Sequence, residues 1–319
     1  MPALHPQIQR VLQVMAEANL KPIEAMTPTE ARAQMEATAQ SRKAEPLPVA
    51  RIEERAIPGP AGNIRLRLYW PNAAAPAPAI VYYHGGGHVI GSLDTHDLVA
   101  RNLCAGAEAL VASVDYRMGP EHKFPAAVED SFAALKWVHG NAASLRADPN
   151  RVGVHGDSAG ANLAAVVALM ARDAGSPRLR LQSLVYPVAD YALAGDSYEK
   201  FAEGYGLLTR QAMVWFRDHY LRTPRDVEDW RASPIKAANF AGAAPAIVVT
   251  AECDVLHDDG KGYAEALRGA GVPVEYKEYP GMIHAFFGMV PVVDDAMNAS
   301  APFGLPSNAL SPGSEVISL

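Results

Sequence analysis

The fold is decided at Gly156-Asp157-Ser158-Ala159-Gly160, five residues that fit the pattern G-x-S-x-G. Residues 151–155 before them are mostly apolar and predict a short buried strand, whereas residues 159–172 are rich in Ala, Leu, Val and Met and predict a helix. A sharp turn between a strand and a helix leaves room only for small neighbours. It places the hydroxyl of Ser158 at the end of the sheet, beside the first N–H groups of the helix and the positive end of its dipole. This context, more than the pentapeptide itself, predicts a reactive serine.

Short apolar stretches alternate with helical ones on both sides of this turn. Strands are predicted at residues 79–83, 110–115, 151–155, 181–186, 246–251 and 274–279, and helices at residues 125–144, 159–172 and 258–269. The alternating apolar residues Ile64, Leu66 and Leu68 predict a further, half-buried strand. Such an alternation is typical of the α/β class, with a mostly parallel central sheet flanked by helices on both faces. We expect residues 1–319 to form a single domain of this class.

Two segments fall outside the alternation. The first 45 or so residues predict helices, because Ile8, Leu12 and Met15 have helical spacing and Pro28 suits the first position of a second helix. Residues 188–244 contain many aromatic side chains but no convincing strand. An insertion this long between two strands favours a lid. We therefore expect about residues 1–45 and 188–225 to form a helical cap over the site.

Composition sets the broad class. The chain has 319 residues and a net charge of −7, with 49% hydrophobic and 20% charged residues, which is the balance of a soluble globular protein. We find no cluster of Lys and Arg for nucleic-acid phosphates, and no apolar run of the about 18 residues that a membrane span needs. The N-terminus lacks the pattern of a signal peptide, and Cys104 and Cys253 match no metal or redox spacing. We expect a cytoplasmic protein with two buried free thiols rather than a disulfide.

The serine needs partners, because an unassisted hydroxyl is a weak nucleophile at neutral pH. His284 follows the last predicted strand and Asp254 follows the strand before it, so both would reach the carboxyl edge of the sheet, where α/β sites collect. Asp258 and Asp259 compete with Asp254, but they fit the start of the following helix, where carboxylates are favoured. The alternative is that Ser158 only eases a turn, His284 is structural and Asp254 is a solvated charge. Their places after strands favour a base and its orienting acid.

A second motif, His84-Gly85-Gly86-Gly87, directly follows the strand predicted at residues 79–83. Glycines without Cβ atoms let backbone N–H groups point at a developing oxyanion. The alternative is an ordinary flexible turn. The N–H of Ala159 is expected to be a further donor, since this residue follows the serine.

Together these motifs resemble the bacterial hormone-sensitive lipase family of α/β-hydrolases. The resemblance runs from about residue 51 to residue 295, and its motifs are His84-Gly85-Gly86-Gly87, Asp115-Tyr116-Arg117, Pro120-Glu121-His122-Lys123-Phe124-Pro125-Ala126-Ala127, Gly156-Asp157-Ser158-Ala159-Gly160, Cys253-Asp254-Val255-Leu256 and Gly281-Met282-Ile283-His284. The order of serine, aspartate and histidine also agrees with an α/β-hydrolase. Asp157 indicates the branch with Asp, rather than Thr, before the serine.

The resemblance implies a role for each site residue. Ser158 would be the nucleophile, Asp254 the acid and His284 the base. The oxyanion N–H groups would come from Gly86, Gly87 and Ala159. His84 would hold the glycine loop and would not act as a catalytic base.

Three positions depart from the family pattern. His88 stands where an aromatic or bulky apolar residue is usual, and Ala161 stands where many members have Gly. The family ends in an amphipathic helix, but residues 299–319 contain prolines and glycines that cannot continue one. We therefore hypothesise that the tail after Asn298 is not the native family ending.

In function, the resemblance implies a serine carboxylesterase that hydrolyses short-to-medium acyl esters through an acyl-enzyme. The expected partner is a small-molecule ester, with no cofactor, no metal and no nucleic acid; a homodimer is left open. Two alternatives also remain. One is an inactive ligand-binding homologue, and the other is an amidase or thioesterase that uses the same three residues.

Overall fold

An eight-stranded sheet organises the chain, in the order β1-β2-β4-β3-β5-β6-β7-β8. The computed structural model describes residues 2–41, 45–73, 76–290 and 292–296. The strands are β1 (Arg51–Gly59), β2 (Gly62–Trp70), β3 (Ala77–Tyr83), β4 (Leu110–Asp115), β5 (Ala147–Asp157), β6 (Leu181–Val185), β7 (Ala246–Cys253) and β8 (Val274–Ile283). β2 pairs antiparallel with β1 and with β4, and every other pair is parallel. The prediction of a mostly parallel α/β sheet is therefore confirmed.

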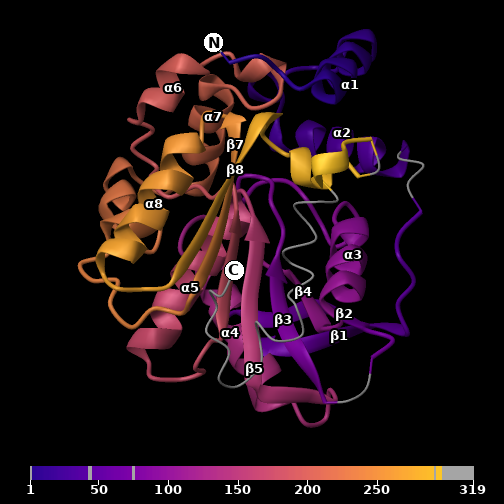
Figure 1. Cartoon of the computed structure of the whole chain (residues 1–319), viewed down its shortest axis with the longest axis vertical. Coiled ribbons are helices and arrows are strands. Elements are labelled where there is room, and N and C mark those ends of the chain that lie inside the picture. The colour runs from indigo at the N-terminus through magenta and orange to yellow at the C-terminus, as the bar shows by residue number, and fades with distance from the viewer. Residues whose placement is uncertain (1, 42–44, 74–75, 291, 297–319) are drawn as a thin grey trace.

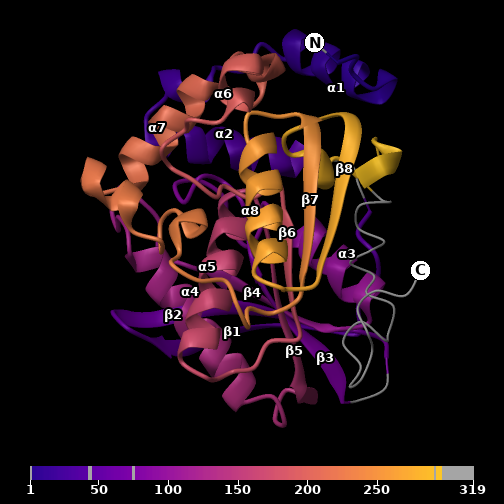
Figure 2. The same ribbon diagram turned by 60° about the vertical axis from the view of Figure 1, so that its left-hand side comes forward.

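Helices cover both faces of the sheet and one of its ends. They are α1 (Pro6–Glu17), α2 (Pro28–Ser41), α3 (Asp97–Ala107), α4 (Ala126–Gly140), α5 (Ala159–Asp173), α6 (Asp196–Lys200), α7 (Arg210–Tyr220) and α8 (His257–Gly269), with short 3₁₀ helices η1 (Ile23–Ala25), η2 (Gly204–Gly206), η3 (Pro224–Glu228), η4 (Pro234–Lys236) and η5 (Phe286–Gly288). α4, α5 and α8 lie on one face and α3 on the other (Figure 1). α1, α2, α6 and α7 gather beyond the carboxyl ends of the parallel strands, as Figure 2 also shows.

All predicted strands and helices are present, with ends shifted by a few residues, but β1 and α3 were not predicted. β1 carries several charges, and all but one of its residues are exposed or half-buried, because it is an edge strand held by pairing with β2. Its sequence therefore lacks an apolar run. α3 did carry a signal, since its buried residues Ala100, Leu103, Cys104 and Ala107 have helical spacing.

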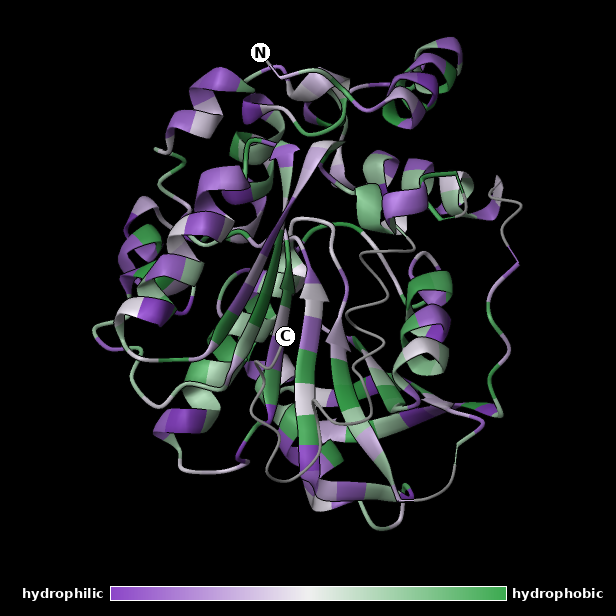
Figure 3. Ribbon diagram, in the orientation of Figure 1, coloured by the Kyte–Doolittle hydropathy of each residue, from purple (hydrophilic) through white to green (hydrophobic). Residues whose placement is uncertain are grey.

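The core lies between the central strands and their helices. Every residue of β3 and of β6 is buried, and β3 is accordingly a continuous run without charged or hydrogen-bonding amide side chains rather than an alternating one. In β6 the buried polar residues have partners, since Gln182 donates to the Ala244 carbonyl and Ser183 contacts His155. α5 is buried along almost its whole length because it packs between β5, β6 and α4. Figure 3 shows the resulting pattern, with hydrophobic residues along the central strands and hydrophilic ones on the outer helices. A rigid core thus holds the β5–α5 junction.

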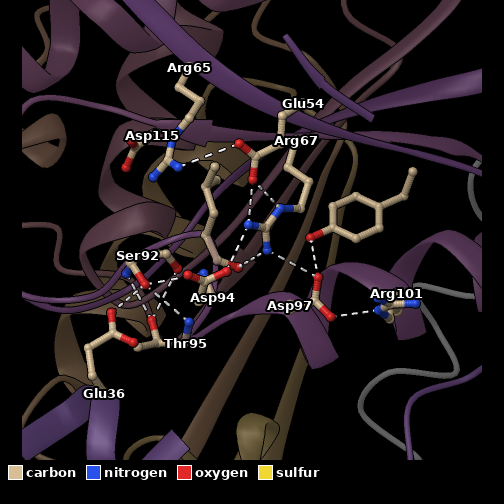
Figure 4. A network of polar contacts seen from close by, with 12 residues as sticks. Glu36, Glu54, Arg65, Arg67, Ser92, Asp94, Thr95, Asp97, Arg101 and Asp115 are labelled. Carbon is tan, nitrogen blue, oxygen red and sulfur yellow. Dashed lines mark hydrogen bonds and ion pairs between the residues drawn. The ribbon is translucent and has the colours of Figure 1, made fainter. Parts of the chain in front are cut away.

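A network of charged side chains centred on Arg67 of β2 fixes the loop that precedes α3 (Figure 4). The guanidinium binds Glu54 of β1 and Asp94, and it lies 3.4 Å from an Asp97 oxygen that also accepts from the Tyr69 hydroxyl. Arg67 is only 12% exposed in its side chain, so its charge needs these carboxylates. From the other side, the Ser92 hydroxyl donates to Glu36 of α2 at 2.6 Å. The loop of residues 92–97 is therefore tied both to the sheet and to the N-terminal segment.

Asp259 stabilises the segment that follows β6 by hydrogen bonds to its backbone. One of its oxygens accepts the backbone N–H groups of Ala189 and Asp190, at 2.8 and 3.0 Å. Burial raises the pKa of Asp259 to about 8, with Asp190 and Asp254 adding repulsion. In the unfolded chain an aspartate has a pKa of about 3.9, so between these values the native state holds a proton that the unfolded state has lost. The free energy of unfolding therefore decreases as the pH rises through this window.

We expect Asp259→Asn to flatten this pH dependence. Asn keeps an oxygen for both N–H groups but carries no ionisable proton. The free energy of unfolding, measured with urea between pH 4 and pH 8, should then decrease less steeply with pH than in the parent protein. The difference in slope should be at most about 1.4 kcal/mol per pH unit. Identical slopes in the two proteins would contradict the raised pKa.

Candidate active site

Ser158 occupies the turn between β5 and α5 in a strained backbone conformation. Its φ and ψ angles are 55° and −120°, a region that side chains other than Gly rarely adopt and that is found at functional sites. A Cβ atom at Gly156 would overlap the backbone of Gly160, and one at Gly160 would overlap the carbonyl of Tyr83. The prediction that only small neighbours fit this turn is therefore confirmed.

A continuous line of hydrogen bonds joins the three residues predicted at the carboxyl edge of the sheet. His284 Nε2 lies 3.0 Å from Ser158 Oγ, and His284 Nδ1 lies 2.7 Å from Asp254 Oδ2. The other oxygen of Asp254 accepts the N–H of Leu256 at 3.0 Å, which orients the carboxylate. Asp254 is only 1% exposed. The structure thus brings together residues that lie 126 and 30 positions apart.

The two competing carboxylates lie in the first turn of α8, as predicted, and have other partners. Asp258 accepts the N–H of Ser197, and Asp259 accepts the N–H groups described above. Their oxygens therefore stabilise the segment that follows β6, and Asp254 is the aspartate that contacts His284.

The glycine loop lies against the elbow. Gly86 and Gly87 have φ angles of +116° and +60°, which favour glycine, and a Cβ atom at Gly87 would overlap the ring of Phe216 from α7. Within the described part of the chain, the N–H groups of Gly86, Gly87 and Ala159 donate to no protein acceptor. N–H groups that are buried or half-buried normally have partners, so these three can serve a bound oxygen.

Two buried histidines support this loop. His84 Nδ1 lies 2.8 Å from the Gly85 carbonyl, and the ring stacks on Tyr116, whose hydroxyl donates to the His84 carbonyl. His88 Nδ1 lies 2.8 Å from the Tyr191 hydroxyl, and its ring stacks on Tyr220 with centroids 3.9 Å apart. Burial lowers the pKa of His84 to about 4 and that of His88 to about 3, so both are neutral near pH 7. At position 88, the imidazole thus packs as an aromatic ring against Tyr220 and Tyr191.

Ser158 and His284 open onto a cavity of about 340 Å³. Apolar side chains from the N-terminal segment (residues 15–39), the α7 region (residues 207–216) and the end of β6 provide most of its lining: Met15, Leu20, Ile23, Met26, Met35, Leu207, Leu208, Met213, Phe216, Tyr186, Val188 and Tyr191. Methionines adapt readily to ligands of different shape. The cavity therefore suits a flexible apolar group placed next to a reactive hydroxyl.

Arg32 of α2 holds the N-terminal segment across the glycine loop. Its guanidinium donates to the carbonyls of Val89 and Gly119 at 2.8 and 2.7 Å and forms a bidentate pair with Glu121. The Arg32 guanidinium lowers the pKa of Glu121 to about 2, which keeps the carboxylate charged. Trp215 of α7 donates to the Met26 carbonyl at 3.1 Å. No short-range pattern signals these contacts, because Arg32 and Val89 are 57 positions apart.

A family model described as alpha/beta hydrolase fold matches residues 80–288. The chain belongs to the α/β-hydrolase family. Over 263 residues, this α/β-hydrolase is 45% identical to the carboxylesterase NlhH of Mycobacterium tuberculosis, covering 80% of this chain and 82% of that protein. It is 44% identical to the carboxylic ester hydrolase LipN of the same organism, covering 75% of this chain and 65% of LipN. The structure of a hyperthermophilic esterase from Pyrobaculum calidifontis superimposes with a TM-score of 0.90 at 40% identity, covering 98% and 100% of the two chains.

Three further predictions concern the cysteines, membrane-spanning helices and the C-terminal residues. Cys104 and Cys253 are buried free thiols, as predicted. Among the helices of the described residues, none is long and apolar enough to cross a bilayer. The predicted departure at residues 299–319 lies outside the described residues and stays a hypothesis.

Proposed function

We propose that this α/β-hydrolase is a serine carboxylesterase of the hormone-sensitive lipase branch. The observation that carries the proposal is the hydrogen-bonded line from Asp254 through His284 to Ser158, at the mouth of a largely apolar cavity. Esterases and carboxylesterases among its relatives support the same reaction.

The first half of the reaction transfers the acyl group to the enzyme. Ser158 Oγ attacks the ester carbonyl while His284 Nε2 takes its proton. Asp254 holds the imidazole in the tautomer with its proton on Nδ1 and stabilises the imidazolium that forms. The bond to the alcohol oxygen then breaks as His284 returns the proton to it, and the alcohol leaves. Water repeats these steps on the acyl-enzyme, which releases the acid and restores Ser158.

In both halves of the reaction, negative charge develops on the carbonyl oxygen and must be stabilised. We assign its stabilisation to the N–H groups of Gly86, Gly87 and Ala159. Gly86 and Gly87 line the cavity together with Ser158, Ala159 follows Ser158 directly, and the three N–H groups lack protein acceptors within the described residues. Ala159 is the first residue of α5, so the helix dipole adds to its effect.

We further propose that residues 1–45 and 188–225 act as the cap. Support comes from the lining of the cavity, which draws on residues 15–39 and 207–216. The size of the cavity favours short-to-medium acyl groups. The two free thiols support a reducing, cytoplasmic location.

A series of p-nitrophenyl esters from C2 to C16 at pH 7.5 tests the proposed function. We expect kcat/KM to peak at a short or medium chain and to be at least about tenfold lower at C16, because an apolar pocket of limited size discriminates between acyl chains by length. No hydrolysis of any ester would contradict the esterase proposal. A maximum at C16 would contradict only the substrate range.

A further inference from the structure

We propose that Asp157 and His96 form a polar subsite that selects esters carrying a hydroxyl group close to the scissile bond. The inference rests on the proposed esterase function and concerns the same cavity. Asp157, His96 and Thr95 all line that cavity, where most of the other side chains are apolar. A polar corner in such a pocket fixes the orientation of a ligand.

The two oxygens of Asp157 have different surroundings. Oδ1 accepts the Tyr82 hydroxyl at 2.7 Å and the Gly85 N–H at 3.2 Å. Oδ2 accepts no hydrogen bond from the described residues, and His96 Nε2 lies 3.8 Å from it. Asp157 is only 8% exposed and lines the cavity, where a largely buried carboxylate gains from each donor that reaches it. Oδ2 can therefore accept a hydrogen bond from a group bound in the cavity.

His96 provides the second side of the subsite. Its Nδ1 lies 2.8 Å from the Thr95 hydroxyl, and Ser92 and Thr95 hydrogen-bond each other within the loop that the Arg67 network holds. The single proton of the Thr95 hydroxyl has two acceptors within reach, His96 Nδ1 at 2.8 Å and the Ser92 carbonyl at 3.1 Å. When it goes to the nearer one, the proton of the neutral imidazole is on Nε2, toward Asp157.

The separation of 3.8 Å between His96 Nε2 and Asp157 Oδ2 is too long for a direct hydrogen bond. One oxygen atom can nevertheless lie about 2.8 Å from both atoms. A hydroxyl fits this gap, because it donates one hydrogen bond to the carboxylate and accepts one from the imidazole. A methyl group in the same place would leave Oδ2 without a donor.

The position of the subsite limits where the hydroxyl stands in the substrate. Asp157 precedes Ser158 directly, and Gly85, whose Cα packs against Asp157 Oδ2, precedes Gly86. The hydroxyl therefore lies within a few bonds of the reacting carbonyl. It belongs either to the acid, as in a hydroxy-acid ester, or to the alcohol, as in a glycol monoester.

Two substrate pairs distinguish these sources. The acid-side pair is ethyl 3-hydroxybutyrate and ethyl 3-methylbutyrate, and the alcohol-side pair is 2-hydroxyethyl butyrate and propyl butyrate. In each pair a methyl group replaces the hydroxyl. Hydrolysis is followed by titration of the released acid. We expect the wild type to favour the hydroxyl member in one pair by about tenfold in kcat/KM, since hydrogen bonds to charged groups are the stronger ones.

The test variant is Asp157→Asn, which keeps an oxygen for Tyr82 and Gly85 but places an NH₂ donor where Oδ2 was. It should lower the preference in that pair about tenfold and leave the ratio in the other pair unchanged. The control is Tyr82→Phe, which removes a hydrogen bond to Oδ1 and leaves Oδ2 in place. It should change the rates for both members of a pair alike, because it disturbs the glycine loop without changing the acceptor.

Several outcomes would overturn the subsite. One is a wild type that prefers the methyl member in both pairs. This outcome is measured on the wild type alone, so it does not depend on whether a variant folds. Another is an active Asp157→Asn protein with unchanged ratios, and a third is a Tyr82→Phe protein whose ratio falls as far as that of Asp157→Asn. A wild type that hydrolyses ethyl butyrate but shows no hydroxyl preference rejects the subsite and leaves the esterase function standing. A wild type that hydrolyses no ester rejects the esterase function itself.

Discussion

Ser158→Ala is expected to lower kcat on p-nitrophenyl butyrate by about 10⁴–10⁶-fold, to near the background rate. The variant loses the atom that forms the acyl-enzyme, whereas the cavity and the oxyanion N–H groups remain. The fold should be unchanged, since Ala fits wherever Ser does in this turn and the Ser158 N–H still donates to the Val185 carbonyl. Circular dichroism and thermal unfolding check the fold, and steady-state kinetics check the rate.

Ser131→Ala is the matched control for this variant. Ser131 is also buried, and its hydroxyl has no hydrogen-bond partner among the described residues. Its replacement should leave kcat within about twofold, because the variant loses one oxygen atom but no hydrogen bond within the described residues. A phosphonate inhibitor should add its mass to the wild type and to Ser131→Ala but not to Ser158→Ala. A full burst of p-nitrophenol from Ser158→Ala would show that another residue is the nucleophile.

Asp254→Asn should reduce kcat by about 10³–10⁴-fold with little change in KM. The amide can present its NH₂ group to His284 Nδ1, which favours the tautomer with the proton on Nε2. That nitrogen then faces Ser158 Oγ at 3.0 Å as a donor and cannot take the serine proton. The substrate still binds, because Asp254 is not among the residues that line the cavity.

Asp258→Asn tests the assignment of the acid. Asp258 lies four positions along the chain and accepts the Ser197 N–H at 2.8 Å. It does not contact His284, so its replacement should change kcat by less than about threefold, with any loss appearing in stability. A larger loss of kcat for Asp258→Asn than for Asp254→Asn would contradict the arrangement of His284 with Asp254.

Much of the fold was predictable because burial leaves local patterns in the sequence. β4 was predicted with its observed bounds, since five of its six residues are buried and most of these are apolar. β1 was not predictable in this way, because an edge strand with a single buried residue owes its place to pairing with β2. The difference lies in whether a segment is stabilised by its own apolar residues or by its neighbour.

At the candidate site, too, some features have a local sequence signal and others depend on contacts between distant segments. The residues of the elbow and of the glycine loop are neighbours in sequence, and their small side chains are required by local backbone geometry. Arg32 gave no such signal, because what matters is that its guanidinium reaches the Val89 carbonyl from another element. Asp157 was visible in the sequence only as a marker of a branch. Its two differently placed oxygens became apparent when Tyr82, Gly85 and His96 were brought around it.

The sequence by itself thus determined the class of fold, the place of Ser158 at a strand–helix turn, and the choice of His284 and Asp254 as its partners. These follow from local periodicity, turn chemistry and the rule that the carboxyl ends of parallel strands share one edge. Only the tertiary structure decided the 3.0 and 2.7 Å contacts of His284, the lining of the cavity and the polar corner at Asp157. Those depend on which side chains from distant segments face one another, and packing rather than local propensity selects them.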